Sequence, residues 1–264
     1  MRPLVYRRAA SLAEAERLLA EHPAATLLAG GMTLIPTLKL RLARPSHVVD
    51  IARLAELRGI DGKDGRLTVG AATTHAEVAG AVAVRRAIPA LAELAAGIGD
   101  PQVRNAGTLG GSVANNDPAA DYPAAVLALD ATIETNRRTI PAAEFLVGMF
   151  ATALAPGEIV LRVGFAMPER AAYRKFAHPA SGYAMAGVFV AEHRDGVRVA
   201  VTGAGPGAFR WREAEAALAK RFNAGSLAGL EPDASGLNAD IHASAEYRAN
   251  LAGVMARRAV AAIQ

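Results

Sequence analysis

The sequence contains no cysteine among its 264 residues. This absence excludes a disulfide, a thiolate zinc site, a cysteine nucleophile and an iron–sulfur cluster held by thiolates of this chain. Aromatic residues make up only 5% of the chain, whereas hydrophobic residues make up 52%. We therefore expect a core built mostly from Ala, Leu, Val and Ile. The length is sufficient for one large domain or for two or three small ones.

Long apolar runs are also missing. The uncharged stretch Pro23 to Leu38 is too short to cross a bilayer, and it contains Gly30, Gly31 and Pro36. The N-terminal residues lack the apolar segment and cleavage site of a secretory signal. The sequence therefore predicts a cytoplasmic protein without a membrane span.

Lysine is scarce: four of the 29 basic residues are lysines, and the net charge is +4. The basic residues are scattered and not interleaved with aromatic residues, which does not favour a nucleic-acid-binding surface. The six histidines show no HxH or HxxxH spacing, and no Gly-x-Ser-x-Gly motif occurs. The sequence thus predicts no metal site and no catalytic triad, and we assign no catalytic residue.

The pattern of apolar segments and breaking residues predicts an α+β protein in three parts, 1–57, 58–168 and 169–264. The first part is predicted as strand, helix, strand, helix and strand, with the first helix beginning at a capping box of Ser11 and Glu14. Later signals include an antiparallel hairpin around the turn at 194–196 and a C-terminal amphipathic helix.

The stretch from Gly97 to Pro123 is predicted to be a long irregular loop. It is rich in Gly, Asn, Asp and Pro and has little apolar periodicity. Loops of this length inside compact domains are usually functional.

Two glycine loops carry the main chemical signal. The first is Ala29-Gly30-Gly31-Met32-Thr33, between a strand and a helix predicted over 33–42, and the second is Thr108-Leu109-Gly110-Gly111-Ser112. Paired glycines allow positive φ, and successive backbone amides can form a nest for an anion. A helix start after the first loop would add a favourable dipole interaction.

The hydroxyls of Thr33 and Ser112 can each donate a hydrogen bond to a phosphate oxygen. Together the loops predict a two-sided clamp for a diphosphate, and their spacing matches neither the Rossmann nor the P-loop motif. The alternative for each loop is a plain tight turn. A third glycine cluster, 203–207, contains Pro206, which removes an amide, and is predicted to be a hairpin exit.

The loops and their flanks, AGGMTLIPTLKLRLARPSHVVDI and DPQVRNAGTLGGSVANNDPAADYPAAVLALDA, resemble the FAD-binding medium subunit of molybdenum hydroxylases. The resemblance continues through YRKFAHPASGYAMAGVFVA to DIHASAEYRANLAGVMARRAV and so covers essentially the whole chain. Medium subunits of carbon monoxide dehydrogenase look nearest, and the xanthine dehydrogenase flavin domain is more distant.

This resemblance implies the para-cresol methylhydroxylase type of FAD-binding fold. Subdomains 1–57 and 58–168 would hold FAD, and a C-terminal α+β domain, 169–264, would close over it. Residues implied to contact the cofactor are Leu28, Ala29, Gly30, Gly31, Met32, Thr33, Leu34, Ile35, Thr108, Leu109, Gly110, Gly111, Ser112, Asp121, Val160, Lys175 and Tyr183.

The resemblance also implies individual roles. Asp121 would bind the sugar region, Val160 would lie beside the flavin where the family often has leucine, Lys175 would lie near the isoalloxazine, and Tyr183 would cover one flavin face. From the residues alone, Asp121 could instead be the N-cap of the next helix, Lys175 a surface charge and Tyr183 a core residue.

The function implied is that of an FAD-binding electron-transfer subunit in a complex with two copies each of three subunits. Electrons would come from a molybdopterin-containing large subunit through a [2Fe–2S] small subunit, and FAD would pass them to an external acceptor such as NAD or a quinone. Two alternatives remain open, a self-contained flavin oxidoreductase of the same fold and a non-enzymatic nucleotide-binding module. The lack of cysteine favours the relay, because a chain without its own cluster must receive electrons from a neighbour.

Overall fold

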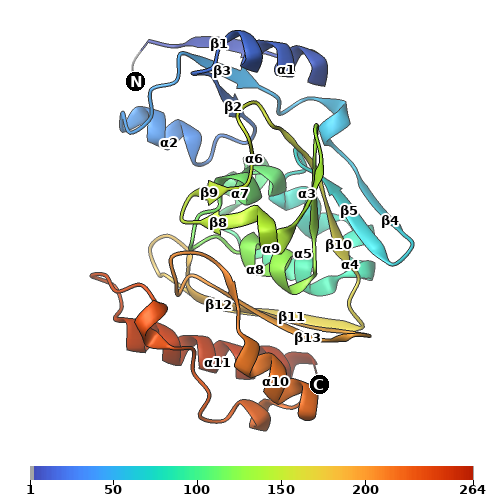
Figure 1. Ribbon diagram of the computed structural model, residues 1–264, viewed down its shortest axis with the longest axis vertical. Coiled ribbons are helices and arrows are strands. Elements are labelled where there is room, and N and C mark those ends of the chain that lie inside the picture. The colour runs from blue at the N-terminus through green and yellow to red at the C-terminus, as the bar shows by residue number, and fades with distance from the viewer. Residues whose placement is uncertain (1–2, 264) are drawn as a thin grey trace.

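The computed structural model describes residues 3–263 and confirms the α+β class. Its elements are arranged in three parts along the long axis, with β1 at one end and α11 at the other (Figure 1). Each part has its own sheet, and these sheets fall within the predicted ranges 1–57, 58–168 and 169–264. The division into domains itself stays a prediction.

The N-terminal part is a parallel sheet in the order β1-β3-β2, flanked by two helices. The Ser11 hydroxyl accepts the Glu14 amide at 3.2 Å and so begins the first helix where the capping signal predicted it. The second helix is shorter than predicted. The elements are β1 (Val5–Arg8), α1 (Leu12–Glu21), β2 (Thr26–Leu28), α2 (Leu34–Lys39), β3 (His47–Asp50) and the 3₁₀ turn η1 (Ala55–Leu57).

The middle part is an antiparallel sheet in the order β4-β5-β10-β6-β7, covered by short helices. Its first hairpin turns at Asp64 and Gly65, both with positive φ, and the residues before the turn form a strand. The strands are β4 (Ile60–Lys63), β5 (Arg66–Gly70), β6 (Thr132–Thr135), β7 (Thr139–Pro141) and β10 (Val160–Ala166), with a separate hairpin of β8 (Leu146–Gly148) and β9 (Ala151–Thr152).

The prediction of an irregular loop over 97–123 is wrong, because the stretch contains two complete short helices and the start of a third. Asp100 accepts the Val103 amide at 2.8 Å, and Thr108 accepts the Gly111 amide at 3.1 Å, so each begins a helix. Six or seven residues are too few for an apolar period, which hid these helices from the pattern. The helices of this part are α3 (His75–Gly80), α4 (Val82–Ala87), α5 (Pro89–Ala96), α6 (Pro101–Ala106), α7 (Leu109–Asn115), α8 (Tyr122–Ala128) and α9 (Ala142–Phe145).

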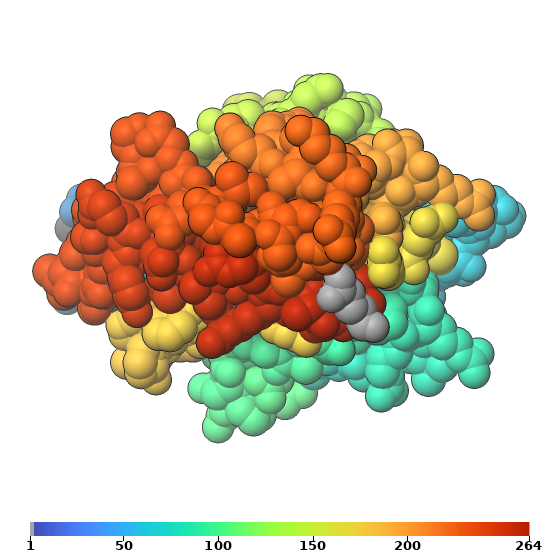
Figure 2. Space-filling view, turned by 90° about the horizontal axis from the view of Figure 1, so that it is seen from below, coloured from blue at the N-terminus to red at the C-terminus, as the bar shows by residue number. Residues whose placement is uncertain are grey.

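The C-terminal part is an antiparallel sheet, β11-β12-β13-β14, packed against the long final helix. Seen from below, it forms one end of the molecule, and its orange and red atoms cover most of the centre of that face (Figure 2). The elements are β11 (Arg170–Ala177), β12 (Ala184–His193), β13 (Gly196–Thr202), β14 (Phe209–Arg210), α10 (Arg212–Lys220), η2 (Ala224–Leu227), η3 (Ala234–Gly236) and α11 (Ala245–Ile263).

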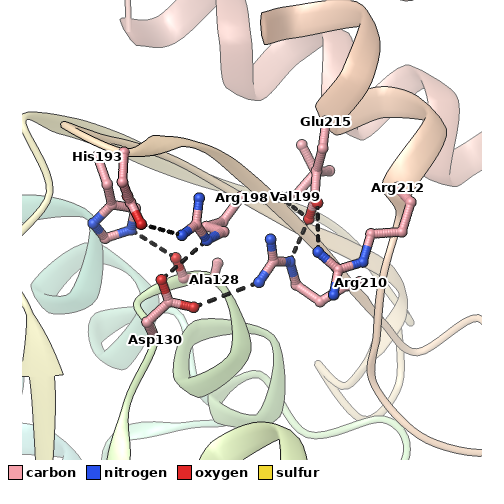
Figure 3. Close-up of polar contacts among 9 residues, drawn as sticks. Ala128, Asp130, His193, Arg198, Val199, Arg210, Arg212 and Glu215 are labelled. Carbon is pink, nitrogen blue, oxygen red and sulfur yellow. Dashed lines mark hydrogen bonds and ion pairs between the residues drawn. The ribbon is translucent and has the colours of Figure 1, made fainter.

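Charged side chains join the C-terminal sheet to the end of α8 (Figure 3). Asp130 forms ion pairs with Arg198 at 3.0 Å and with Arg210 at 3.5 Å. Arg210 also forms an ion pair with Glu215. The His193 ring lies 2.9 Å from the Ala128 carbonyl oxygen. These contacts hold the third part against the middle one. Residues of both parts line the cavity described below. Among the described helices, none is long and apolar enough to span a membrane.

Candidate cofactor-binding site

The two glycine loops line one cavity of about 690 Å³. This volume lies within the range of sites for cofactors and other small molecules. Segments from all three parts of the chain contribute to its wall. The residues around the loops that line it include Ala71, His75, Gly107, Asn115, Asp117, Glu158 and Ser181.

Most of the predicted cofactor residues line this cavity. Four of them are not among the lining residues: Leu28, Ile35, Leu109 and Lys175. The predicted residues that do line it are Ala29, Gly30, Gly31, Met32, Thr33, Leu34, Thr108, Gly110, Gly111, Ser112, Asp121, Val160 and Tyr183.

The first loop lies directly against the backbone that leads into the second loop. A Cβ atom added to Gly30 would lie 2.0 Å from the carbonyl oxygen of Ala106 and 2.6 Å from the Cα of Gly107. A Cβ on Gly111 would lie 4.0 Å from the Cβ of Ala29. Gly30 is thus required for the first loop to pack against the backbone that leads into the second.

The first loop exposes a run of unpaired backbone amides. Among residues 3–263, no acceptor pairs with the amides of residues 30–34, although all five residues line the cavity. Gly31 has a φ of 71°, which lets the chain turn there without strain. Successive free amides of this kind attract an anionic oxygen.

The second loop differs, because its amides are already paired. Leu109 donates to the Thr73 carbonyl at 3.0 Å and Gly110 to the Ala71 carbonyl at 2.9 Å. Gly111 donates to the Thr108 hydroxyl, and Ser112 donates to the Thr108 carbonyl at 3.0 Å. The expectation of an amide nest at this loop is therefore wrong. Its available groups are side chains, the hydroxyls of Thr108 and Ser112.

The glycines of the loops serve two different purposes. Only Gly31 among the four has positive φ, so the expectation that paired glycines supply left-handed turns fails for Gly30, Gly110 and Gly111. A Cβ on Gly110 would lie 2.4 Å from the Cβ of Ala71, inside van der Waals contact. Gly30 and Gly110 permit close packing of backbones, and Gly31 permits a turn.

Asp121 and Lys175 form one buried group. The Lys175 ammonium lies 3.0 Å from Asp121 Oδ2 and 2.9 Å from the carbonyls of Gly97 and Gly182. The Tyr173 hydroxyl donates to Asp121 Oδ1. Burial raises the pKa of the Asp121 carboxyl, and the Lys175 cation opposes that rise.

These contacts decide between the readings of the two residues. Asp121 occupies the N-cap position of α8, but its side chain bonds to β11 and forms no capping hydrogen bond to the described amides of that helix. Lys175 is no solvated charge, because its side chain is 13% exposed and holds three acceptors. It lies behind Asp121 and does not line the cavity.

Tyr183 and Val160 lie in different parts of the wall. Tyr183 is 45% exposed and precedes β12, so it is not a core residue. Burial of part of the ring raises the pKa of its phenol, and the charges of Asp117 and Asp121 add to this. Val160, at the start of β10, is buried and supplies apolar surface.

Sequence reasoning missed His75, which lies at the start of α3 between the capping residues Thr74 and Glu77. The side chain lines the cavity and is 5% exposed. Burial lowers the pKa of its imidazole to about 4, and the charge of Arg104 adds to this. A histidine directly after a strong capping threonine was the available signal, but the capping box alone explained the local pattern.

The described residues hold no cluster of three or more histidine or acidic side chains that could ligate a metal ion. The donors around the cavity are instead free amides, hydroxyls and an imidazole, which suit a nucleotide with a phosphate group.

Comparison with known proteins supports this assignment. The family described as the FAD binding domain in molybdopterin dehydrogenase matches residues 2–168. The medium chain of carbon monoxide dehydrogenase from Hydrogenophaga pseudoflava is 34% identical over 97% of this chain and 95% of its own length. Subunit alpha of the 6-hydroxypseudooxynicotine dehydrogenase complex from Paenarthrobacter nicotinovorans is 36% identical over 95% of this chain and 91% of its own.

Solved structures agree. Quinoline 2-oxidoreductase from Pseudomonas putida contains a chain that superimposes with a TM-score of 0.90 at 30% identity, covering 99% of this chain and 97% of that one. The predicted resemblance to medium subunits is thus confirmed. The chain belongs to the FAD-binding subunits of molybdenum hydroxylase-type oxidoreductases, with FAD as the cofactor of the family.

Proposed function

We propose that the cavity between the two glycine loops holds FAD, with the pyrophosphate on the free amides of residues 30–34. The observation that carries this placement is the contrast between these unpaired amides and the fully paired amides of the second loop. A diphosphate binds where several donors converge without a competing acceptor. The hydroxyls of Thr33, Thr108 and Ser112 supply the remaining donors.

The flanking residues then take distinct roles. Asp121 accepts hydrogen bonds from the sugar region while Lys175 and Tyr173 hold its carboxylate in place. Val160 provides apolar contact, and Tyr183 lies against one face of the flavin. Residues 1–57 and 58–168 act as the cofactor-binding subdomains, and 169–264 closes the site through Ser181, Gly182 and Tyr183, which line it.

The chain serves as the electron-transfer subunit of a larger complex. When bound, FAD supplies a carrier that accepts two electrons and can release them one at a time. The chain has no cysteine and so no thiolate-held iron–sulfur cluster of its own, which supports an electron donor in another subunit. The donor we propose is a [2Fe–2S] small subunit that is reduced by a molybdopterin-containing large subunit. An external acceptor, NAD or a quinone, reoxidises the flavin in the cytoplasm.

Cofactor binding is tested by titrating the apoprotein with FAD and following flavin fluorescence. The proposal expects saturable binding that quenches the fluorescence, and Tyr183→Ala should reduce the quenching while it leaves the fold intact. Absence of FAD binding, in the chain alone and in its complex, would contradict the proposal.

The electron path is tested by purifying the native complex and reducing it with the substrate of the large subunit. Bleaching of the flavin band only when the small subunit is present supports the relay. Reduction of the flavin by a small substrate acting on this chain alone would instead support a self-contained flavin oxidoreductase.

A further inference from the structure

The cavity wall beside the second loop contains a buried histidine, His75, whose ring nitrogens lack a hydrogen-bond partner among the described residues. Among residues 3–263, no group forms a hydrogen bond with either ring nitrogen of His75, and Nδ1 is fully buried. Leaving a buried polar group unsatisfied costs about 1–3 kcal/mol. Nε2, which lies beside Gly107 in the cavity wall, is not fully buried, so it is the ring nitrogen that a ligand can reach.

The backbone around His75 is fixed to the second loop. The His75 amide donates to the Gly107 carbonyl at 3.0 Å, and Thr74 and Thr108 form an antiparallel bridge. With the bonds from Leu109 to Thr73 and from Gly110 to Ala71, these contacts join segment 71–75 to segment 107–110. The imidazole is therefore held at a fixed place in the wall.

Gly107 leaves the ring edge uncovered. A Cβ at Gly107 would lie 2.6 Å from Nε2 of His75 and 2.9 Å from Cδ2, so no larger residue fits there. On its other side the ring packs against Tyr122, with ring centroids 5.4 Å apart. Gly107 and His75 both line the cavity, whereas Tyr122 does not.

The chemistry of this wall calls for a side-chain donor. Since the amides of residues 109–112 are paired, those residues can contact a diphosphate only through side chains. Burial lowers the pKa of His75 to about 4, so the ring is neutral near pH 7 and carries one N–H donor. A neutral imidazole can donate to a phosphate oxygen without placing a second charge in the wall.

We propose that His75 is a cofactor-binding residue, whose imidazole N–H donates a hydrogen bond to the pyrophosphate of FAD from the wall of the second glycine loop. This inference rests on the proposed function, because it requires the pyrophosphate to lie between the two loops. It adds a residue outside both glycine motifs to the set that recognises the cofactor.

The test compares affinity with stability. His75→Phe and His75→Leu remove both nitrogens but keep an apolar group against Tyr122. Since they also remove an orphaned buried atom, the apoprotein should melt at the same temperature as wild type or higher. The dissociation constants for FAD and for ADP should both rise about 10- to 100-fold, because a hydrogen bond to a charged group is lost. His75→Gln, which keeps an N–H donor, should recover part of the affinity.

Tyr122→Phe is the matched control. It also removes a buried polar atom without a partner among the described residues, the Tyr122 hydroxyl. Tyr122 packs against the imidazole but does not line the cavity. It should leave both dissociation constants unchanged. Wild-type affinity in His75→Phe and His75→Leu, or a loss for FAD with none for ADP, would overturn the proposal for His75. Failure of the wild-type protein to bind FAD at all would overturn the proposed site together with it.

Discussion

The two glycine loops look alike in sequence but differ in what they offer a ligand. The first presents unpaired amides at residues 30–34, and the second has its amides bonded to segment 71–75 or to Thr108. Gly31 alone among the four glycines has positive φ, while Gly110 is required by contact with Ala71. A Gly-Gly pair followed by a hydroxyl therefore does not by itself define an anion nest.

The difference has a physical reason. The first loop follows an edge strand, β2, and leads into a helix, so no neighbouring strand supplies acceptors for its amides. The second loop runs beside the segment that follows β5, where the carbonyls of Thr73 and Ala71 accept the amides of Leu109 and Gly110. In the site proposed above, the first loop would bind with its backbone and the second would position side chains.

The largest effect should come from Gly110→Val. The added side chain would collide with the backbone of Ala71, which lies 2.7 Å from the position of its Cβ. Overpacking of this kind costs about 1–3 kcal/mol, and a branched residue at a backbone contact should reach the upper end. The melting temperature of the apoprotein measures this.

Gly111→Ala is the control for that variant. A Cβ at Gly111 meets only the Thr108 hydroxyl at 2.8 Å and, at 4.0 Å, the Cβ of Ala29. It should lower the melting temperature much less. Equal losses in the two variants would contradict the packing role assigned to Gly110.

Gly31→Ala should have the next largest effect. Its φ of 71° costs an L-residue about 1–2 kcal/mol. Because the strain is relieved by turning the amides of residues 30–34, FAD affinity should fall about tenfold. Titration with FAD checks this, and affinity equal to that of wild type would show that these amides do not bind the cofactor.

Two threonine variants should have smaller effects, and they should differ in folding stability but not in the direction of their effect on FAD binding. Thr108→Ala removes the N-cap of α7 and should cost about 1 kcal/mol of folding stability. Thr33→Ala should leave stability nearly unchanged, since among the described residues no amide bonds to its hydroxyl. Both should weaken FAD binding. Urea unfolding of the apoproteins separates them, and a larger loss for Thr33→Ala would reverse the comparison.

The smallest effect on folding stability at neutral pH concerns the titration of His75. Its folded pKa of about 4 lies below the ordinary value of 6.5, because burial disfavours the cation. The unfolded chain therefore binds a proton that the folded chain refuses, so this contribution to stability is lost as pH falls from 6.5 to about 4. Below about pH 4 the loss should level off.

Unfolding free energies at pH 7, 5.5 and 4.5 test this. His75→Phe should lose less stability than wild type over this range. Hydrogen bonds from Arg138 lower the pKa of Glu158 to about 2, so its contribution falls only below 4.5 and does so in both proteins. Parallel pH profiles would show that the imidazole does not titrate as described.

The sequence predicted local features well and long-range contacts poorly. Capping at Ser11, the hairpin at β12 and β13, and the α+β class all depend on neighbouring residues or on local periodicity. The hydrogen bonds of the Leu109 and Gly110 amides could not be predicted, because their acceptors, the carbonyls of Thr73 and Ala71, lie in an earlier and separate segment of the chain. The same holds for Lys175, whose partner Asp121 lies 54 residues away.

Three features escaped for more specific reasons. The helices α6 and α7 are too short for apolar periodicity. Strand β11 carries Arg170, Arg174 and Lys175, so its charges masked its pairing with β12. His75 was not singled out, because it lies within a capping box, formed by Thr74 and Glu77, that already accounted for the local sequence pattern.

Hydrogen exchange of the backbone amides, with and without FAD, tests the central claim most directly. The unpaired amides of residues 30–34 should exchange fast in the apoprotein and become protected when FAD binds. The paired amides of residues 109–112 should be protected already and change little. Unaltered exchange at 30–34, or new protection confined to 109–112, would contradict the assignment of the first loop as the backbone site for the pyrophosphate.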